Sequence, residues 1–323
     1  MSFELSVETA PAWLARHGLN PADARVVATE LGGGVSATVI AVQGDGVAVV
    51  LKQALGRLRV ADRWEASLDR TETEAAALEL LGELTPGAVP RVLAQDAGDH
   101  VVALELLPLE ARNWQAEIGE GRVRPELGRW AGTTLGTWHA RTADRPGLAD
   151  RFDRFDAFEE LRLAPFHETV MKRRPELAEA VGSFAAELRS VRLCLVDGDY
   201  APKNMLVTAD GRAWAYDLEV AHVGNPVFDL GFFLSFVVLS AIRWPELTEE
   251  LRALADGFGA GYAAAGGLVR DAPSVTAHTA CLMLARTDGV SPAAFLDDPA
   301  RDRARSAATA MLARPEEGLW SWS

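Results

Sequence analysis

One polar loop set between apolar strands constrains the chain more than any other feature. Residues 196–207 read as a strand, a loop and a short strand, and the turn at residues 209–211 leads into another strand. The loop carries Asp199 and, five residues later, Asn204, while Asp217 ends the following strand thirteen residues further on. Mg²⁺ prefers such carboxylate and amide oxygens and shares its shell with substrate phosphates. This layout is typical of a phosphoryl-transfer loop, in which Asp199 accepts a hydroxyl proton; the alternative is a surface turn rich in Asp and Asn.

Composition limits the classes of partner that the chain can bind. The net charge of −14 argues against nucleic acid and anionic membranes, both of which need basic patches. It is compatible with a cationic substrate, although a solvated acidic surface is the simpler explanation. Cys194 and Cys281 lie in apolar surroundings, which favours reduced thiols in a cytoplasmic protein. We find no signal peptide, and the apolar run at residues 228–242 contains Asp229, so we expect a buried helix.

Three strands with a glycine turn between the first two are predicted near the N-terminus. Residues 26–31, 35–43 and 47–52 have strand character. The turn between the first two holds Gly32, Gly33 and Gly34, followed by Ser36. A hairpin that needs positive φ explains these glycines, and so does a loop whose backbone N–H groups cover phosphates. The second interpretation gains weight from a lysine on the third strand.

Lys52 ends an apolar strand, where a lysine is costly to bury unless it is paired. The helix predicted at residues 67–84 offers Glu74 as a partner, with Glu72 as a competing candidate on a different face. A strand lysine that contacts nucleotide phosphates and is held by a helix glutamate is the kinase arrangement. We therefore predict Lys52 and Glu74 as nucleotide-binding residues.

Two further strands, at residues 90–95 and 101–107, complete a predicted five-stranded antiparallel sheet. The chain leaves the sheet at Glu105 and Leu107, either as a hinge that binds adenine or as a plain strand end. We predict a nucleotide-binding lobe at residues 1–107 and a catalytic, acceptor-binding lobe at residues 108–323. The second lobe should be mainly helical, with helices at residues 125–140, 156–163, 175–188, 228–242, 246–265, 274–286 and 299–312.

The loop from Asp197 to Asn204 resembles the signature of the aminoglycoside-phosphotransferase and choline-kinase superfamily. That superfamily has a bilobal, protein-kinase-like α+β fold, and its signature is His-Gly-Asp followed, after four residues, by Asn. Two segments are most similar to its methylthioribose kinase branch: residues 51–55 followed by residues 58–60, Trp64 and residues 68–70, and residues 217–219. The resemblance implies ATP and Mg²⁺ as cofactors, Asp199 as the catalytic base, and Asn204, Asp217 and Glu219 as metal ligands.

Two features refine what the resemblance implies. Asp197 replaces the family histidine, and we expect it to hydrogen-bond in the histidine's place while setting a second carboxylate beside Asp199. Asp217 and Asp229 are only twelve residues apart, which leaves no room for the activation segment that docks peptides in protein kinases. We therefore expect a small-molecule hydroxyl acceptor, with Asp229 in a structural role.

Several alternatives remain open from the sequence. The first hypothesis is a kinase of a methylthioribose-like sugar, and the second is a kinase of an aminoglycoside or a choline-like aminoalcohol. The third hypothesis is a nucleotide-binding protein without catalysis. Trp64 covers the substrate or is a surface aromatic. Arg286 and Asp288 face the acceptor, or Arg286 is a helix C-terminal arginine. A homodimer is compatible with all of these.

Overall fold

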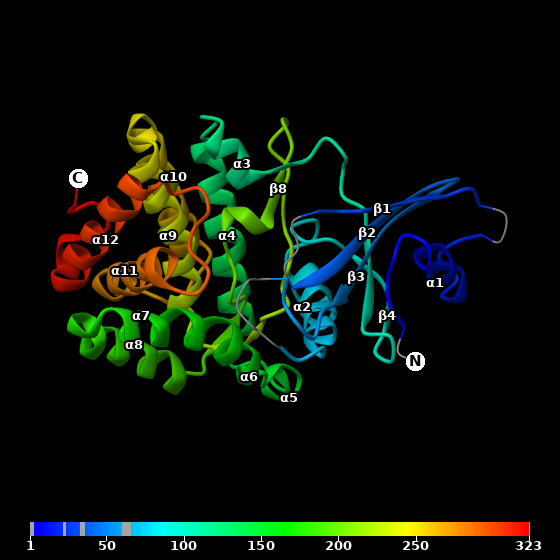
Figure 1. Cartoon of the computed structure of the whole chain (residues 1–323), viewed down its shortest axis with the longest axis horizontal. Helices are drawn as coiled ribbons and strands as arrows, with labels where there is room; N and C mark the ends of the chain where they lie inside the picture. Colours follow the sequence, from blue (N-terminus) through cyan, green and yellow to red (C-terminus); the bar gives the residue numbers. More distant parts are fainter. Residues whose placement is uncertain (1–2, 22–23, 33–35, 60–65, 323) are drawn as a thin grey trace. The chain divides into compact units, whose positions relative to one another are not determined.

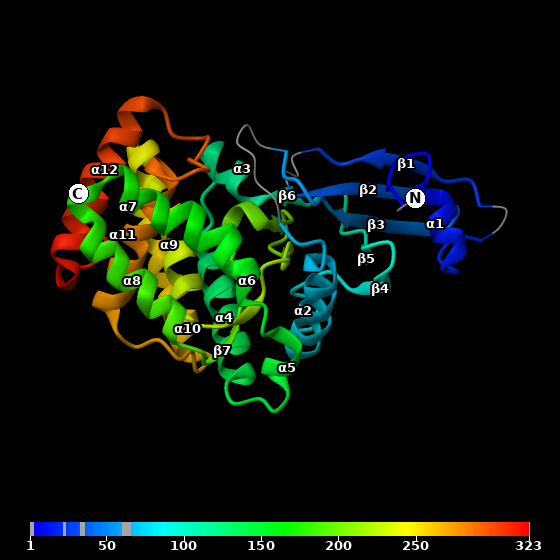
Figure 2. The ribbon, with the colours of Figure 1, turned by 60° about the horizontal axis from the view of Figure 1, so that its bottom comes forward.

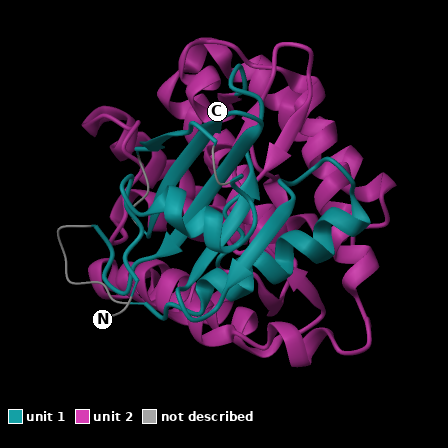
Figure 3. Cartoon of the chain, turned by 90° about the vertical axis from the view of Figure 1, so that its right-hand side faces the viewer, with its two compact units in different colours: residues 1–111, 216–219 teal, residues 112–215, 220–323 magenta. Residues whose placement is uncertain are grey.

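The computed structural model describes residues 3–21, 24–32, 36–59 and 66–322. The chain forms two compact units, coloured separately in Figure 3. Unit 1 comprises residues 1–111 and 216–219, and unit 2 comprises residues 112–215 and 220–323. The short segment Tyr216–Glu219 therefore carries Asp217 and Glu219 into the unit that contains Lys52.

Unit 1 contains the predicted five-stranded antiparallel sheet, which is confirmed (Figure 1). Its strand order is β1-β2-β3-β5-β4, with every neighbouring pair antiparallel. The strands are β1 (Val27–Glu30), β2 (Ala37–Gly44), β3 (Val47–Ala54), β4 (Val92–Asp96) and β5 (Val101–Glu105). Gly44 and Gly46 have positive φ in the β2–β3 turn, and a Cβ on Gly44 would come within 2.1 Å of the Arg25 carbonyl oxygen. Only glycine is tolerated there.

Successive side chains of β3 point to opposite faces of the sheet and so lie in two different surroundings. Val47, Val49 and Leu51 enter the apolar core formed with α1 (Ala10–Arg16). Lys52 takes the opposite direction because successive strand residues point to opposite faces. There it meets α2 (Arg70–Leu84). The register of one strand thus decides that Lys52 contacts a helix and not the apolar core.

Unit 2 is mainly helical, as predicted from the sequence. Its α-helices are α3 (Trp114–Gly119), α4 (Pro125–Thr142), α5 (Leu148–Phe152), α6 (Phe155–Phe158), α7 (Thr169–Arg173), α8 (Ala178–Ser190), α9 (Val227–Arg243), α10 (Thr248–Ala264), α11 (Ala272–Asp288) and α12 (Asp298–Ala313). The apolar helix α9 packs against α10, α11 and α12 and is buried along nearly its whole length (Figures 1 and 2). Among the described residues, no helix is long and apolar enough to span a membrane.

Helices α4 and α10 approach each other closely through a row of glycines. Gly128, Gly132 and Gly136 recur every four residues on one face of α4. A Cβ at these positions would lie 2.1, 1.9 and 2.6 Å from the carbonyl oxygens of Leu254, Phe258 and Tyr262, respectively. Backbone contact at this range excludes any side chain, so the glycines fix the spacing of the two helices.

Short strands frame the polar loop of unit 2. β7 (Cys194–Val196) precedes the loop and pairs with β10 (His222–Gly224). A 3₁₀ turn at Pro202–Asn204 ends the loop, and β8 (Met205–Val207) pairs with both β9 (Ala213–Ala215) and β6 (Arg112–Asn113). Cys194 and Cys281 are free and buried, as expected. Of these strands, β6 and β10 were not predicted from the sequence.

The sequence-based element bounds need two corrections. The sequence predicts a first helix at residues 6–16, but this helix begins at Ala10, since residues 7–9 form a turn. The helix expected at residues 156–163 is instead α6 followed by a π-helical segment, Glu159–Glu168, that contains Pro165. Proline lacks a backbone N–H, so it interrupts the regular α-helical bonding there. Gly33, Gly34 and Trp64 lie outside the described residues.

Burial of His167 leads to a prediction about acid stability. The side chain is 1% exposed, and among the described residues neither ring nitrogen has a hydrogen-bond partner. Burial lowers the pKa of His167 to about 3, with His278 and Arg189 adding to the effect. The unfolded chain therefore binds more protons than the folded one below about pH 6.5, so stability present above that pH is lost as the pH falls.

We expect His167→Leu to reduce the stability lost between pH 7 and pH 5 by ~2 kcal/mol. Urea unfolding followed at both pH values measures this difference. The control is Leu163→Ala, at a buried side chain of the same π-helical segment that has no titratable group; it should leave the loss unchanged. If His167→Leu and the wild type lost the same free energy of unfolding between pH 7 and pH 5, the prediction would be contradicted.

Candidate active site

The polar loop of unit 2 is anchored on α9 through its backbone. The Asp229 carboxylate accepts hydrogen bonds from the N–H groups of Asp197 (2.8 Å) and Gly198 (2.9 Å). The same carboxylate is 3.1 Å from Nε2 of His139, whose Nδ1 lies 3.0 Å from the Tyr262 hydroxyl. Because Asp229 and His139 are fully buried, their partners hold them in one orientation. The predicted structural role of Asp229 is therefore confirmed.

The Asp197 side chain stabilises the loop by a hydrogen bond to its backbone. Its Oδ1 accepts a hydrogen bond from the backbone N–H of Asp199 at 2.9 Å. Gly198, between the two aspartates, has φ of +79°, and a Cβ there would come within 3.1 Å of Val220. The carboxylate of Asp197 thus stabilises a tight turn that presents Asp199, as expected for a residue in the position of the family histidine.

The Asp199 side chain is surrounded by donors. Its Oδ1 is 3.0 Å from Nη2 of Arg162, and its Oδ2 accepts a hydrogen bond from Nδ2 of Asn204 at 2.6 Å. Oδ2 also forms an ion pair with Lys203. Arg162 is itself fixed by a 2.6 Å hydrogen bond from Nε to the Gly198 carbonyl. This group of contacts orients a nearly buried carboxylate whose two oxygens are both defined.

In unit 1, Lys52 lies between two carboxylates. Its Nζ is 2.8 Å from Glu74, and it also pairs with Asp217. Glu72, the competing candidate, contacts His100 instead. Burial alone lowers the pKa of Lys52, but the charges of Asp217, Glu74 and Glu219 outweigh it, so the pKa is raised. Burial raises the pKa of Glu74 to about 7, against the opposing effect of Lys52.

Asp217 and Glu219 are each held differently. Asp217 has φ of +70°, a left-handed conformation that is uncommon for a residue with a side chain. Such conformations cluster at binding and catalytic sites. Glu219 forms a buried ion pair with Arg70 at 2.8 Å. Arg70 also donates to the carbonyl oxygens of Leu55 (2.8 Å) and Ser36 (3.3 Å).

The remaining predicted residues of unit 1 lie at or just beyond the ends of strands β1 and β5. Gly32 is exposed at the end of β1. Glu105 forms a 2.7 Å ion pair with Arg91, and the N–H of Leu106 donates to the Ala48 carbonyl at 3.2 Å, so the sheet bonding continues one residue past β5. Leu107 follows, half-buried, where the chain leaves the sheet.

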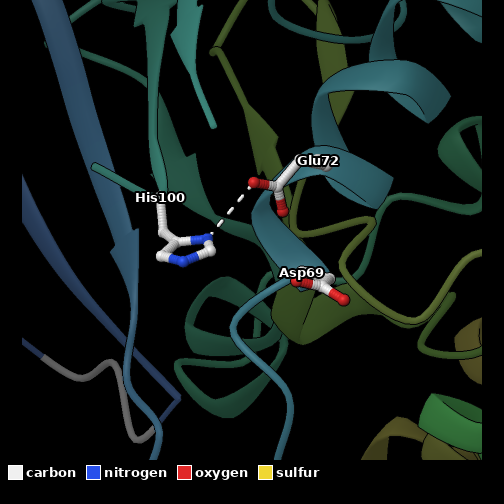
Figure 4. Close-up of side chains that lie close together, drawn as sticks. All are labelled: Asp69, Glu72 and His100. Carbon is white, nitrogen blue, oxygen red and sulfur yellow. Dashed lines mark hydrogen bonds and ion pairs between the residues drawn. The ribbon is translucent and has the colours of Figure 1, made fainter. Parts of the chain in front are cut away.

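A second group of ligand-type side chains lies at the start of α2. Potential ligand atoms of Asp69, Glu72 and His100 all lie within 4.8 Å of one another (Figure 4). The close contact is the 3.2 Å pair between Glu72 and His100, and Figure 4 shows Asp69 directed away from it. Asp69 is exposed and precedes the first turn of α2, where an acidic side chain is favourable without a metal. We assign no site to this group.

Sequence reasoning missed two arginines that organise these groups. Arg162 lies 37 residues before Asp199 in the π-helical segment, and Arg70 lies 149 residues before Glu219. Both pairings are long-range contacts that no local spacing encodes. The only sequence signal was that Arg70, like Lys52, falls in a stretch that resembles the methylthioribose kinase branch.

The sheet with its lysine–glutamate pair and the helical unit with its Asp–Asn loop define a protein-kinase-like fold. A family model described as the phosphotransferase enzyme family matches residues 27–268. The chain therefore belongs to that family. A relative at 30% identity over 270 residues is the methylthioribose kinase of Bacillus pumilus strain SAFR-032, with 74% of this chain and 67% of that protein covered.

Solved structures with the same fold include proteins named as kinases of small molecules. A microcompartment-associated aminopropanol kinase superposes with a TM-score of 0.57 at 18% identity, covering 98% of this chain and all of the other. A choline/ethanolamine kinase family protein from Mesorhizobium loti gives 0.54 at 19% identity, covering 96% and 95% of the two chains. At these identities the likeness establishes the fold and not the acceptor.

Proposed function

We propose that the protein transfers the γ-phosphoryl group of ATP to a hydroxyl of a small, sugar-like molecule. The observation that carries the proposal is the arrangement at Asp199, whose two carboxylate oxygens are held by Arg162, Lys203 and Asn204. Family membership supports phosphoryl transfer, and the methylthioribose kinase relative supports a sugar hydroxyl.

In the proposed reaction, Asp199 orients the acceptor hydroxyl and takes its proton as the new O–P bond forms. The bond between the γ-phosphorus and the bridging oxygen breaks, and ADP leaves with that electron pair. Lys52, oriented by Glu74, neutralises phosphates that are not transferred. Gly32, Gly33, Gly34 and Ser36 are proposed to cover the phosphates, and the backbone at Glu105 and Leu107 to bind adenine.

The donor set fits Mg²⁺. The amide nitrogen of Asn204 donates to Asp199, which orients the amide with its oxygen as the group suited to a cation. Asp217 and Glu219 contribute carboxylates, the type of ligand that Mg²⁺ requires. We propose these three residues as ligands. When bound, the ion neutralises charge on the phosphates.

An ADP-release assay tests the proposal over sugars, aminoglycosides, choline-like alcohols and hydroxy amino acids. We expect ADP release that depends on one class of hydroxyl compound, with a phosphorylated product visible by mass spectrometry, and none with Asp199→Ala. Methylthioribose is the first compound to test because of the relative. Stabilisation by Mg-ATP without transfer to any acceptor would instead identify a nucleotide-binding protein without catalysis.

A further inference from the structure

Three cationic side chains of unit 2 lie along one aromatic stripe of α9. Lys203 and Arg162 are 6.0 and 5.9 Å from the ring centre of Phe232. Arg286 is 5.5 Å from the ring of Phe236, which itself packs against Phe232 with 5.5 Å between ring centres. We call Arg162, Lys203 and Arg286 the basic cluster. The stripe collects three positive charges from separate segments near Asp199.

The basic cluster gathers positive charge in a chain that is acidic overall. Arg162 and Lys203 both contact the carboxylate of Asp199. The chain as a whole carries a net charge of −14, so the three cationic side chains on one aromatic stripe contrast with the charge of the molecule.

Arg286 is the member without a counter-ion. Its Nη1 donates to the carbonyl (2.6 Å) and hydroxyl (3.4 Å) of Ser291, both neutral acceptors. Across the described residues, no carboxylate lies within ion-pair distance of its guanidinium, and its buried Nε has no hydrogen-bond partner. Burial lowers its pKa to about 10; the charge of Arg162 acts in the same direction and that of Asp199 opposes it.

A structural role explains Arg286 only in part. It lies in the last turn of α11, where a basic side chain interacts favourably with the helix dipole. That effect does not require a half-buried guanidinium with an unsatisfied donor, which costs free energy in the absence of an anion. A guanidinium in this state is suited to bind a carboxylate or phosphate through two parallel hydrogen bonds.

Resting on the proposed function, we propose that the acceptor alcohol carries an anionic group, a carboxylate or a phosphate ester, that is bound by Arg286 beside Asp199. The rest of the basic cluster adds positive charge around that group. Aminoalcohols and aminoglycosides are cations at neutral pH, so the same charges disfavour them. Neutral sugars, methylthioribose included, lack the group that Arg286 binds.

Matched acceptors that differ only in charge test the proposal. The three-carbon series is glycerate, glycerol 3-phosphate, glycerol and 3-amino-1,2-propanediol, and the five-carbon series is ribonate, ribose 5-phosphate, ribose and methylthioribose. Binding is measured as thermal stabilisation of the full chain with Mg-ADP present, and turnover as ADP release. We expect an anionic member to stabilise the protein and to exceed its neutral counterpart by about tenfold or more in kcat/KM. Comparing glycerate with glycerol 3-phosphate and ribonate with ribose 5-phosphate separates carboxylate from phosphate.

Arg286→Met should lower kcat/KM for the preferred anion about tenfold or more and leave the KM for Mg-ATP unchanged. Arg286→Lys keeps the charge but loses the planar guanidinium, so its kcat/KM for the anion should lie between those of the wild type and Arg286→Met. The matched control is Arg303→Met on α12, whose guanidinium donates to the Ile242 carbonyl at 3.0 Å; it should change neither constant.

Three results would overturn the proposal. One is that neutral or cationic members bind and react as well as anionic ones. Another is that no anionic member stabilises the protein with Mg-ADP. The third is that Arg286→Met weakens Mg-ATP and not the acceptor, which would assign the basic cluster to the nucleotide. Failure of the proposed function itself is distinguishable, because no compound of any charge would then give ADP release, whether or not Mg-ATP stabilises the protein.

Discussion

Asp199→Asn should lower kcat for phosphotransfer by ~10²–10⁴-fold while Mg-ATP still binds. The amide keeps the size of the carboxylate but cannot accept the hydroxyl proton. It also turns an acceptor into a donor beside Lys203, so the acceptor hydroxyl loses its orientation. Single-turnover kinetics with the best acceptor, together with calorimetric titration of Mg-ATP, measures the two effects separately.

The control for this experiment is Asp210→Asn in the turn between β8 and β9. Asp210 is exposed and accepts hydrogen bonds from Arg212 at 3.1 and 3.4 Å, so its change should leave kcat within twofold. A kcat in Asp199→Asn that stays near the wild-type value would show that Asp199 is not the base. Loss of Mg-ATP binding would instead indicate that the variant disturbs the loop.

Lys52→Met should destabilise the protein by ~3–5 kcal/mol, because it leaves Glu74 buried without its cation. Glu74 is 2% exposed and Lys52 10%, so water cannot replace the lost partner. Mg-ATP affinity should fall as well, since the phosphates lose their cation. Urea unfolding and nucleotide titration measure the two losses.

The double variant Lys52→Met/Glu74→Gln tests the physical cause. Removing the buried charge together with its partner should recover much of the lost stability, but none of the lost nucleotide affinity.

Without Lys52 the pKa of Glu74 rises further above its unfolded value, so the single variant should lose stability as the pH rises from about 5 to 8. The exposed pair of Arg91 and Glu105 provides the control, as Arg91→Met should cost only ~0–1 kcal/mol. Equal costs at both sites would contradict the interpretation.

The parts of the molecule that were predicted from sequence depend on local rules. Strand-forming residues on both sides of Gly44-Asp45-Gly46 predicted the β2–β3 hairpin, and the expected pairing of Lys52 with Glu74 followed from the cost of burying a lysine. The role of Asp229 followed from its place at the start of an apolar helix. Each of these needs only a short stretch of chain, or one element packed on another.

The parts that could not be predicted depend on long-range contacts. Nothing in the sequence near Arg162 indicates that it lies in a π-helical segment and contacts Asp199. Nothing in the sequence near Arg286 indicates that its guanidinium packs on the ring of Phe236. Arginine is common on helix surfaces, so its presence alone carries little information. Only the packed helices of unit 2 distinguish these two from the others.

The glycine contact between α4 and α10 has a consequence for how this protein can be re-engineered. His139 on α4 contacts Tyr262 on α10 through one ring nitrogen and Asp229 through the other, and Asp229 holds the backbone of the loop that bears Asp199. Library mutagenesis should therefore find two kinds of position at which activity is lost. Substitutions at Gly128, Gly132 or Gly136 should abolish turnover for every acceptor alike, whereas changes at Arg286 should redistribute turnover among acceptors. Selection for a new substrate should therefore accept substitutions at Arg286 and reject nearly all substitutions at the three glycines.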